Sequence, residues 1–284
     1  MTKYPVASLE EYGYKNYRTF KKVWLILRKV FVSLIVFSLY IPIIILLIQS
    51  VNSSANVNQF DNFTLDWYVN MLSNRSLRNA IANTLLTSFI ATLLATVLGT
   101  LMAIGIHALS KRKRQQVVLL NNIPILNADI VSGISLMLVF SLLLPIFPYI
   151  FGPVTLILAH LFFTLPYVVL SVLPKLKEMD PNLMDAALDL GIKPYKALVK
   201  VIVPAITAGI FSGMLLALTM SIDDFVISYY TTGNGFDNLS IWIYGSIGRK
   251  SLTPSVYAFS TLLTLTTLGL LTVYQLFVKR GKKK

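Results

Sequence analysis

The sequence predicts an all-α integral membrane protein with six transmembrane helices and a short cytoplasmic hairpin of helices. Its 284 residues are 55% hydrophobic and 13% charged, and the mean hydropathy is +0.69. This composition is too apolar for a soluble domain of that length. Long apolar stretches alternate with polar segments, and the basic residues gather at the ends of the apolar stretches, as in multi-spanning membrane proteins.

The chain begins with a basic tail at 1–23, which we predict to be cytoplasmic and to lie along the membrane surface. Residues 24–49 form the first predicted transmembrane helix, in which Pro42 is a candidate kink. A polar segment follows, and a second span is predicted over 84–106. Small residues recur every four positions along this second span, a pattern that favours close packing of helices.

The third apolar stretch, 117–144, is longer than one span requires, and its first part contains asparagines, a proline and an aspartate. Irregular backbone persists at membrane depth only where it is buried in protein or lines water. We therefore predict a broken first part followed by a regular helix from about Ile130. The remaining spans are predicted at 154–173, 206–230 and 254–278.

The distribution of Lys and Arg predicts the orientation of these spans. With both termini in the cytoplasm, cytoplasmic segments hold 21 of the 25 basic residues: seven through Lys29, four at 111–114, five at 174–205 and five in the basic tail 279–284. The remaining basic residues, predicted outside, are Arg75, Arg78, Arg249 and Lys250. The asymmetry follows the positive-inside rule and accounts for the net charge of +13 without nucleic acid as a partner.

The residue inventory excludes several kinds of chemistry. The chain contains no cysteine and only two histidines, so thiolate metal sites and histidine clusters are not expected. It contains no P-loop motif, so we predict no ATP site, cofactor or metal in this chain. His160 stands alone among apolar residues and is predicted to be a satisfied core residue and not a ligand.

The polar interruption at 174–205 predicts two short helices joined by a sharp turn. Asp180 is a candidate N-cap of the first helix, and Gly191 a left-handed C-cap. Pro194 is predicted to open the second helix, and Pro204 to end it.

Each helix of this hairpin carries an apolar stripe. The stripes consist of Leu183, Met184, Ala187 and Leu188 in the first helix, and Tyr195, Leu198, Val199 and Ile202 in the second. A hairpin this short cannot bury its stripes alone. Two interpretations follow, an ordinary loop at the membrane surface or a docking surface for another subunit.

The order Asp185-Ala186-Ala187, then Gly191, then Ile202-Val203-Pro204 resembles the EAA loop of ABC importer permeases, although Asp185 stands where glutamate is usual. In that family the loop forms coupling helices that dock into a groove on the ATP-binding subunit. The resemblance thus implies a coupling role for Asp185, Ala186, Ala187, Gly191, Tyr195, Leu198 and Pro204.

Three carboxylates lie within apolar stretches, where a charge costs ~2.5–3.5 kcal/mol at the bilayer centre. Asp223 and Asp224 fall near the outer end of the fifth span, either as a negative pair at the mouth of a path for a cationic solute or as residues of the outer interface. Asp129 either lines the same path or caps the following helix. Tyr229, Tyr230 and Trp242 are candidate partners for a cation, or members of an aromatic belt.

A wider resemblance covers most of the chain, from about Phe63 to the sixth span. The segments DIVSGISL at 129–136, TLPYVV at 164–169 and SIDDFVIS at 221–228, together with the hairpin, are similar to the permease subunits of spermidine/putrescine ABC importers. That family commonly has a proline directly before the acidic residue of the third span. In this chain the acidic residue is Asp129, and Ala128 precedes it.

This resemblance implies a MetI-like permease fold, with a core at 79–278 that contains the coupling loop 174–205. It implies a sister permease, two copies of an ATP-binding subunit that carries ATP and Mg²⁺, and an extracytoplasmic polyamine-binding protein. The chain would be a multi-pass protein of the cell membrane that supplies a path and not a catalyst.

Three other functions remain open from the sequence. An ABC permease for another solute would share the hairpin. A secondary transporter or channel would not need it. A membrane-embedded enzyme would need a catalytic set that the sequence does not show.

The orientation can be tested with single cysteines, because the natural chain has none. We expect a cysteine at Ser110 to react with an impermeant thiol reagent only from the cytoplasmic side, and one at Ser251 only from the outside. Labelling of both positions from the same side would contradict the six-span prediction.

Overall fold

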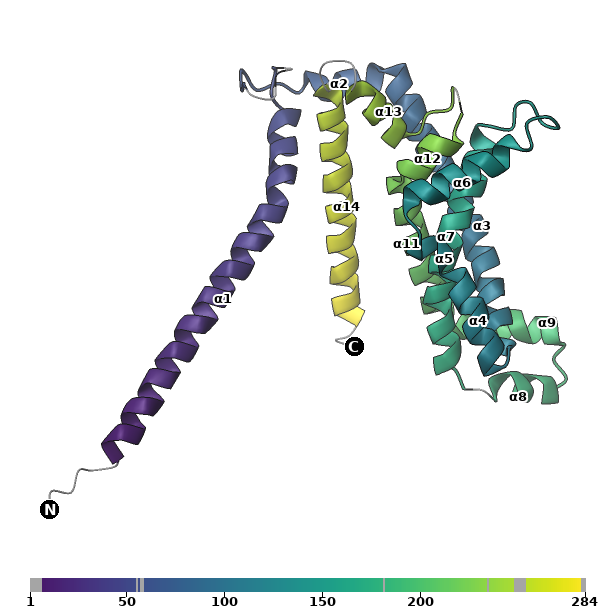
Figure 1. The fold of residues 1–284 in the computed structure, drawn as a ribbon, viewed down its shortest axis with the longest axis horizontal. Coiled ribbons are helices and arrows are strands. Elements are labelled where there is room, and N and C mark those ends of the chain that lie inside the picture. The colour runs from purple at the N-terminus through teal and green to yellow at the C-terminus, as the bar shows by residue number, and fades with distance from the viewer. Residues whose placement is uncertain are drawn as a thin grey trace. The chain divides into compact units, whose positions relative to one another are not determined.

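The computed structural model describes residues 7–54, 56, 59–180, 182–233, 235–247 and 254–281, which are almost entirely helical (Figure 1). The predicted outer residues Arg249, Lys250 and Ser251 and the last three residues of the basic tail lie outside the described residues. Contacts divide the chain into two compact units, Met1–Met71 with Leu252–Lys284, and Leu72–Ser251.

The first unit contains two long helices that pack against each other, α1 (Ala7–Ser50) and α14 (Pro254–Gly281). The predicted tail and first span are not separated by a helix boundary. Instead, α1 runs without interruption from Ala7 through Pro42 to Ser50, because elongating an existing helix costs far less than starting one. The short helix α2 (Asp66–Ser73) follows a loop in which the buried Asn52 accepts hydrogen bonds from two backbone amides.

The second unit is built on three helices that lie side by side, α3 (Arg75–Ala108), α7 (Pro153–Glu178) and α11 (Thr207–Asp223) (Figure 1). Their contact is close because glycines face the neighbouring backbones. A Cβ atom on Gly99 would lie 2.8 Å from the Cβ of Val168, and one on Gly209 would lie 2.9 Å from the carbonyl oxygen of Ser171. The small-residue stripe of the second predicted span therefore serves helix packing, as expected.

The third apolar stretch is broken as the sequence predicts. It forms α4 (Lys111–Asn121), α5 (Ile123–Leu126) and α6 (Asp129–Ser141). The regular helix begins at Asp129, one residue before the predicted start, with Ala128 at the N-cap.

The fifth apolar stretch differs from the prediction of one helix over 206–230. Helix α11 ends at Asp223, and after a break at Asp224 and Phe225 a separate helix, α12 (Val226–Thr231), begins. A further helix, α13 (Leu239–Ile247), follows in the polar loop. The cause of the break is the carboxylate of Asp224, described below.

The first helix of the hairpin starts later than predicted. Pro174 lies inside α7, which continues to Glu178, so the hairpin is an extension of that helix. Helix α8 (Leu183–Asp189) has Asn182 at its N-cap, and Asp180 instead accepts a hydrogen bond from the backbone amide of Asn182 at 2.9 Å. The predicted turn at Gly191 is confirmed, with φ at +76°.

The second helix of the hairpin does not end at Pro204. It consists of α9 (Pro194–Ala197), the π-helical turn η1 (Leu198–Ile202) and α10 (Val203–Ala205), which contains that proline. Because Pro204 lacks an N–H donor, it fits the first turn of α10 and leaves no orphaned amide. The chain bends by 73° between α10 and α11.

Three described helical segments are long and apolar enough to cross a membrane, Phe20–Ser50, Arg75–Ala108 and Pro153–Glu178. The bent pair of Pro194–Ala205 with Thr207–Asp223 makes a fourth if it counts as one span. Six spans thus remain a prediction for the full chain.

The close packing of α3 on α7 gives a stability prediction. We expect Gly99→Ala to lower stability by about 1–3 kcal/mol, because the added Cβ would overlap the Val168 side chain. Gly105→Ala, in the same helix, is the matched control, since a Cβ there meets nothing within 4 Å. Thermal unfolding of the two purified variants in detergent measures the difference, and equal melting temperatures would contradict the close α3–α7 contact.

Candidate functional site

The break between α11 and α12 is organised by the side chain of Asp224. Its Oδ2 accepts a hydrogen bond from the backbone amide of Ser228 at 2.7 Å, and its Oδ1 accepts one from the amide of Ile227 at 3.3 Å. These amides belong to the first turn of α12 and would otherwise lack partners. Asp224 therefore acts as a capping residue for α12, and its own backbone is extended.

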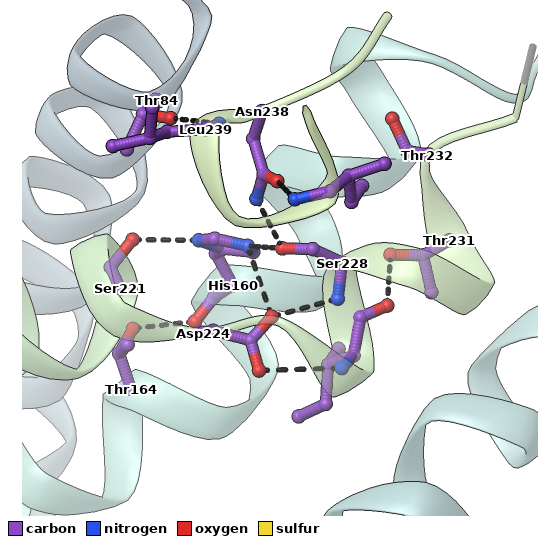
Figure 2. A network of polar contacts seen from close by, with 12 residues as sticks. Thr84, His160, Thr164, Ser221, Asp224, Ser228, Thr231, Thr232, Asn238 and Leu239 are labelled. Carbon is purple, nitrogen blue, oxygen red and sulfur yellow. Dashed lines mark hydrogen bonds and ion pairs between the residues drawn. The ribbon is translucent and has the colours of Figure 1, made fainter. Parts of the chain in front are cut away.

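A buried histidine joins this cap to the rest of the bundle (Figure 2). His160, on α7, is 1% exposed. Its Nδ1 lies 2.7 Å from the Oγ of Ser221 on α11, and its Nε2 lies 2.8 Å from the Oγ of Ser228 on α12. The same Nε2 is 3.7 Å from Asp224 Oδ2. Both ring nitrogens have partners, so the prediction that His160 is a satisfied core residue is confirmed.

Asn238 extends these contacts to α13 and α3 (Figure 2). Its Nδ2 donates to Ser228 Oγ at 2.8 Å, and its Oδ1 accepts from the amide of Ile241 at 2.9 Å. The next amide along the chain, that of Leu239, donates to Thr84 Oγ1 on α3 at 2.7 Å. We call this set the buried polar network: Thr84, His160, Ser221, Asp224, Ser228 and Asn238.

The other two predicted path carboxylates are exposed. Asp223 is the last residue of α11, and Asp129 is the first of α6. The alternative that Asp129 caps α6 is wrong, because the N-cap is Ala128 and no side chain caps this helix. Helix α6 packs on α12, and the Asp129 carboxylate is near enough to Asp224 for their charges to repel.

Aromatic rings cluster at the break between α11 and α12. The ring of Phe225 lies 4.8 Å from that of Tyr244 and 5.6 Å from that of Tyr229, centre to centre. Tyr229 also pairs with Tyr230, at 5.6 Å. The indole of Trp242 instead donates a hydrogen bond to Ser76 Oγ on α3 at 2.9 Å. The structure thus brings Tyr230 into the ring cluster and points Trp242 to α3.

The sequence analysis missed Tyr244 and the cap. Tyr244 lies in the apolar insert after the fifth span, two residues from Trp242, and nothing in the spacing favours one ring over the other. The available signal for the cap was Asp224 itself, since aspartate side chains commonly accept hydrogen bonds from backbone amides at the start of a helix.

The hairpin is the second candidate site, at the opposite end of the three-helix bundle from α12 and α13 (Figure 1). Its stripes are divided in the structure. Ala187 is 4% and Ile202 5% exposed, so these two pack within the chain, and Leu198 is half-buried. The apolar side chains that stay exposed are Leu183, Leu188, Leu190, Tyr195 and Val199.

The remaining predicted coupling residues are also on the surface. Asp185, Ala186, Gly191 and Pro204 are exposed. The buried Ala187 supports the hairpin from inside, so a docking partner would meet its neighbours and not its side chain.

Known proteins with similar sequences are transport proteins. The chain is 33% identical over 259 residues to the spermidine/putrescine transport system permease protein PotC of Escherichia coli K12, covering 91% of this chain and 96% of that protein. It is 31% identical over 228 residues to the putrescine transport system permease protein PotI of the same organism, covering 79% and 81%.

Solved structures show the same fold. A chain of a bacterial ABC transporter involved in the import of the acidic polysaccharide alginate matches with a TM-score of 0.66 at 16% sequence identity, covering 95% of this chain and all of that one. The family described as binding-protein-dependent transport system inner membrane component matches residues 117–283. The chain therefore belongs to this family, the membrane-embedded permease subunits of ABC transporters, and has the MetI-like fold.

Proposed function

We propose that this chain is a permease subunit of an ATP-driven importer of polyamines, with spermidine and putrescine as solutes. The single observation that carries the proposal is the end of α11, where the exposed carboxylate of Asp223 directly precedes the break in the helix. The rings of Phe225, Tyr229, Tyr230 and Tyr244 cluster around the residues that follow this break. The identity of 31–33% to polyamine permeases supports it.

The chemistry of this cluster suits a flexible polycation. An ammonium group 4 Å from a carboxylate gains about 4 kcal/mol at an effective dielectric constant of 20, before its desolvation is subtracted. Tyrosine faces add cation–π attraction. A few such contacts at an exposed site attract a cation without trapping it, whereas a fully buried carboxylate cage would hold it.

The two adjacent aspartates have different tasks in this proposal. Asp224 is occupied by two backbone amides of α12 and by its contact with His160, so it positions the cluster. Asp223 makes no ion pair within the described residues and presents its carboxylate to the solute.

The hairpin would connect this path to the energy source. Its exposed apolar side chains suit the groove of an ATP-binding subunit, of which two copies would serve this chain and a sister permease. The hairpin continues from α7 on one side and bends into α11 on the other. ATP-driven closure of the partner subunits would therefore move helices that reach the candidate path directly.

Delivery of the solute and the orientation of the chain in the membrane complete the proposal. An extracytoplasmic polyamine-binding protein would release the solute at the α12 and α13 end of the bundle. Both termini would lie in the cytoplasm, since that arrangement places the hairpin on the side of the ATP-binding subunits and satisfies the positive-inside rule.

The coupling role predicts the effect of a charge on the hairpin surface. Tyr195 is 62% exposed, so Tyr195→Asp should leave the fold intact and disrupt an apolar contact with the ATP-binding subunit. Exposed tyrosines at the centre of an interface commonly contribute 2 kcal/mol or more. We expect co-purification of the ATP-binding subunit, or coupled uptake, to fall about tenfold or more.

Tyr149→Asp is the matched control for this measurement. Tyr149 is 97% exposed and precedes α7 at the end opposite the hairpin, so its substitution should leave co-purification unchanged. Normal co-purification and normal uptake with Tyr195→Asp would remove the coupling role from this surface.

The solute role predicts different effects for the two aspartates. Asp223→Asn should lower uptake of radiolabelled putrescine and spermidine by about tenfold, the loss of one contact of about 1.4 kcal/mol, with no change in melting temperature. Asp224→Asn should lower both uptake and stability, because Asp224 accepts with both oxygens and asparagine has only one, so one amide of α12 loses a hydrogen bond worth about 1 kcal/mol.

Asp61→Asn, at an exposed loop position outside both candidate sites, is the charge-matched control for uptake. Uptake is measured in vesicles that contain the complete importer, alongside ATPase activity. Full uptake with Asp223→Asn would show that the carboxylate does not serve the solute.

A further inference from the structure

A cavity lies between α4 and α7. These two helices approach each other near the hairpin end of the bundle (Figure 1). Its volume is about 510 Å³. The residues around it are Arg114, Gln115, Val118 and Leu119 on α4, and Leu170, Leu173, Pro174 and Lys177 on α7. Most of the wall is therefore apolar, and the two cationic residues belong to the ends of the helices nearest the hairpin.

The two cations of the cavity have no acidic partner. Within the described residues, the ion pairs are those of His160 with Asp224 and Lys175 with Glu178, so neither Arg114 nor Lys177 faces a carboxylate within 4 Å. Both positive charges also act on the ring of His107. The cavity thus combines apolar walls with an uncompensated positive end.

Part of the Arg114 guanidinium is already fixed, and part is unsatisfied. Its Nη2 donates to the carbonyl oxygen of His107 and, at 3.2 Å, to that of Leu109, which closes the C-terminal end of α3. Its Nε is buried without a hydrogen-bond partner in the described part of the chain. Because this Nε is enclosed by protein, an anion in the cavity would meet the partly exposed remainder of the guanidinium, which lines the wall.

The first turn of α4 points to an anion as well. It contains Lys111, Arg112 and Lys113 and no acidic residue, although the N-terminus of a helix favours negative charge. Ser110 at the N-cap makes no side-chain hydrogen bond to the exposed amides. None of these three basic residues lines the cavity, so they add a weak long-range attraction for an anion and no direct contact.

We propose that this cavity binds an anionic phospholipid, with its phosphate between Arg114 and Lys177 and an acyl chain along Val118, Leu119 and Leu170. A free phosphate would use only the positive end and would leave the apolar wall uncovered. Leu119 is 67% exposed, so the wall opens to the side from which a lipid of the surrounding membrane can enter. The inference concerns the membrane and does not depend on which solute is carried.

A lipid at this place would brace α4 against the base of the hairpin. Lys177 is the last residue but one of α7, which leads directly into the hairpin. The lipid would therefore stabilise the part of the chain through which we propose that the ATP-binding subunit acts.

Native mass spectrometry of the full chain in neutral detergent tests the proposal. The probes are phosphatidylglycerol, phosphatidylcholine and inorganic phosphate, each titrated separately. We expect phosphatidylglycerol to bind about tenfold more tightly than phosphatidylcholine, and Lys177→Gln to remove most of that preference, since one charge-assisted contact is of that size. A second variant, Leu119→Trp, should weaken phosphatidylglycerol by filling the apolar wall.

Lys113→Gln is the matched control, because Lys113 is an exposed residue of the same basic cluster that does not line the cavity. In neutral detergent no anionic leaflet is present, so a distant lysine should contribute little. Equal binding of the two lipids, or equal losses in Lys177→Gln and Lys113→Gln, would overturn the site. Displacement of phosphatidylglycerol by millimolar inorganic phosphate would overturn the lipid assignment in favour of a free anion.

Discussion

The fold around the candidate path depends on one constraint, a carboxylate that is largely buried inside an apolar helix bundle. A charge in such a place is costly unless hydrogen bonds and a partner satisfy it. Asp224 meets this requirement by ending α11, turning the backbone and accepting two amides of α12. His160 then fixes both helices, since its two ring nitrogens reach a serine on each. The break after α11, the short helix α12 and the contacts of His160 thus all satisfy the same buried carboxylate.

This arrangement separates two residues that look equivalent in the sequence. Asp224 is committed to the backbone, which leaves Asp223 as the carboxylate that can exchange partners. The same separation holds in the hairpin, where Ala187 is internal and Tyr195 is exposed. Each of these two motifs contains residues that support the local structure and residues that are exposed to a partner or a solute. The burial of the side chains separates the two kinds of residue, and their spacing in the sequence does not.

The sequence predicted the helical membrane fold from its composition, the broken third stretch from its polar interruptions and the turn at Gly191 from the glycine. Each of these signals lies in the segment whose structure it predicts. It did not predict the break in 206–230, since no proline or glycine falls near Asp224 and the apolar character continues through Val226. The hydrogen bonds that form the break are local, from the amides of Ile227 and Ser228 to Asp224, but the buried partner of this carboxylate, His160 on α7, is distant in sequence. Trp242 and Tyr244 were indistinguishable for a similar reason, because only the packing of α13 on α3 decides that Trp242 bonds α3 and that Tyr244 joins the ring cluster.

The two candidate sites are connected by helices of different stiffness. Between the hairpin and Asp223, α11 is a single helix of 17 residues, about 25 Å long, and its glycines press against α7 so closely that the pair has little room to deform. Beyond Asp223 the helix is broken at Asp224 and Phe225, and the short helix α12 that follows packs on α6 and is hydrogen-bonded to His160 and Asn238. A displacement that starts at the hairpin would therefore be transmitted along α7 and α11 as a rigid pair and would meet its first compliant joint at the buried polar network. The carboxylates and rings stand at that joint, where a small rotation changes their spacing without unpacking the apolar core.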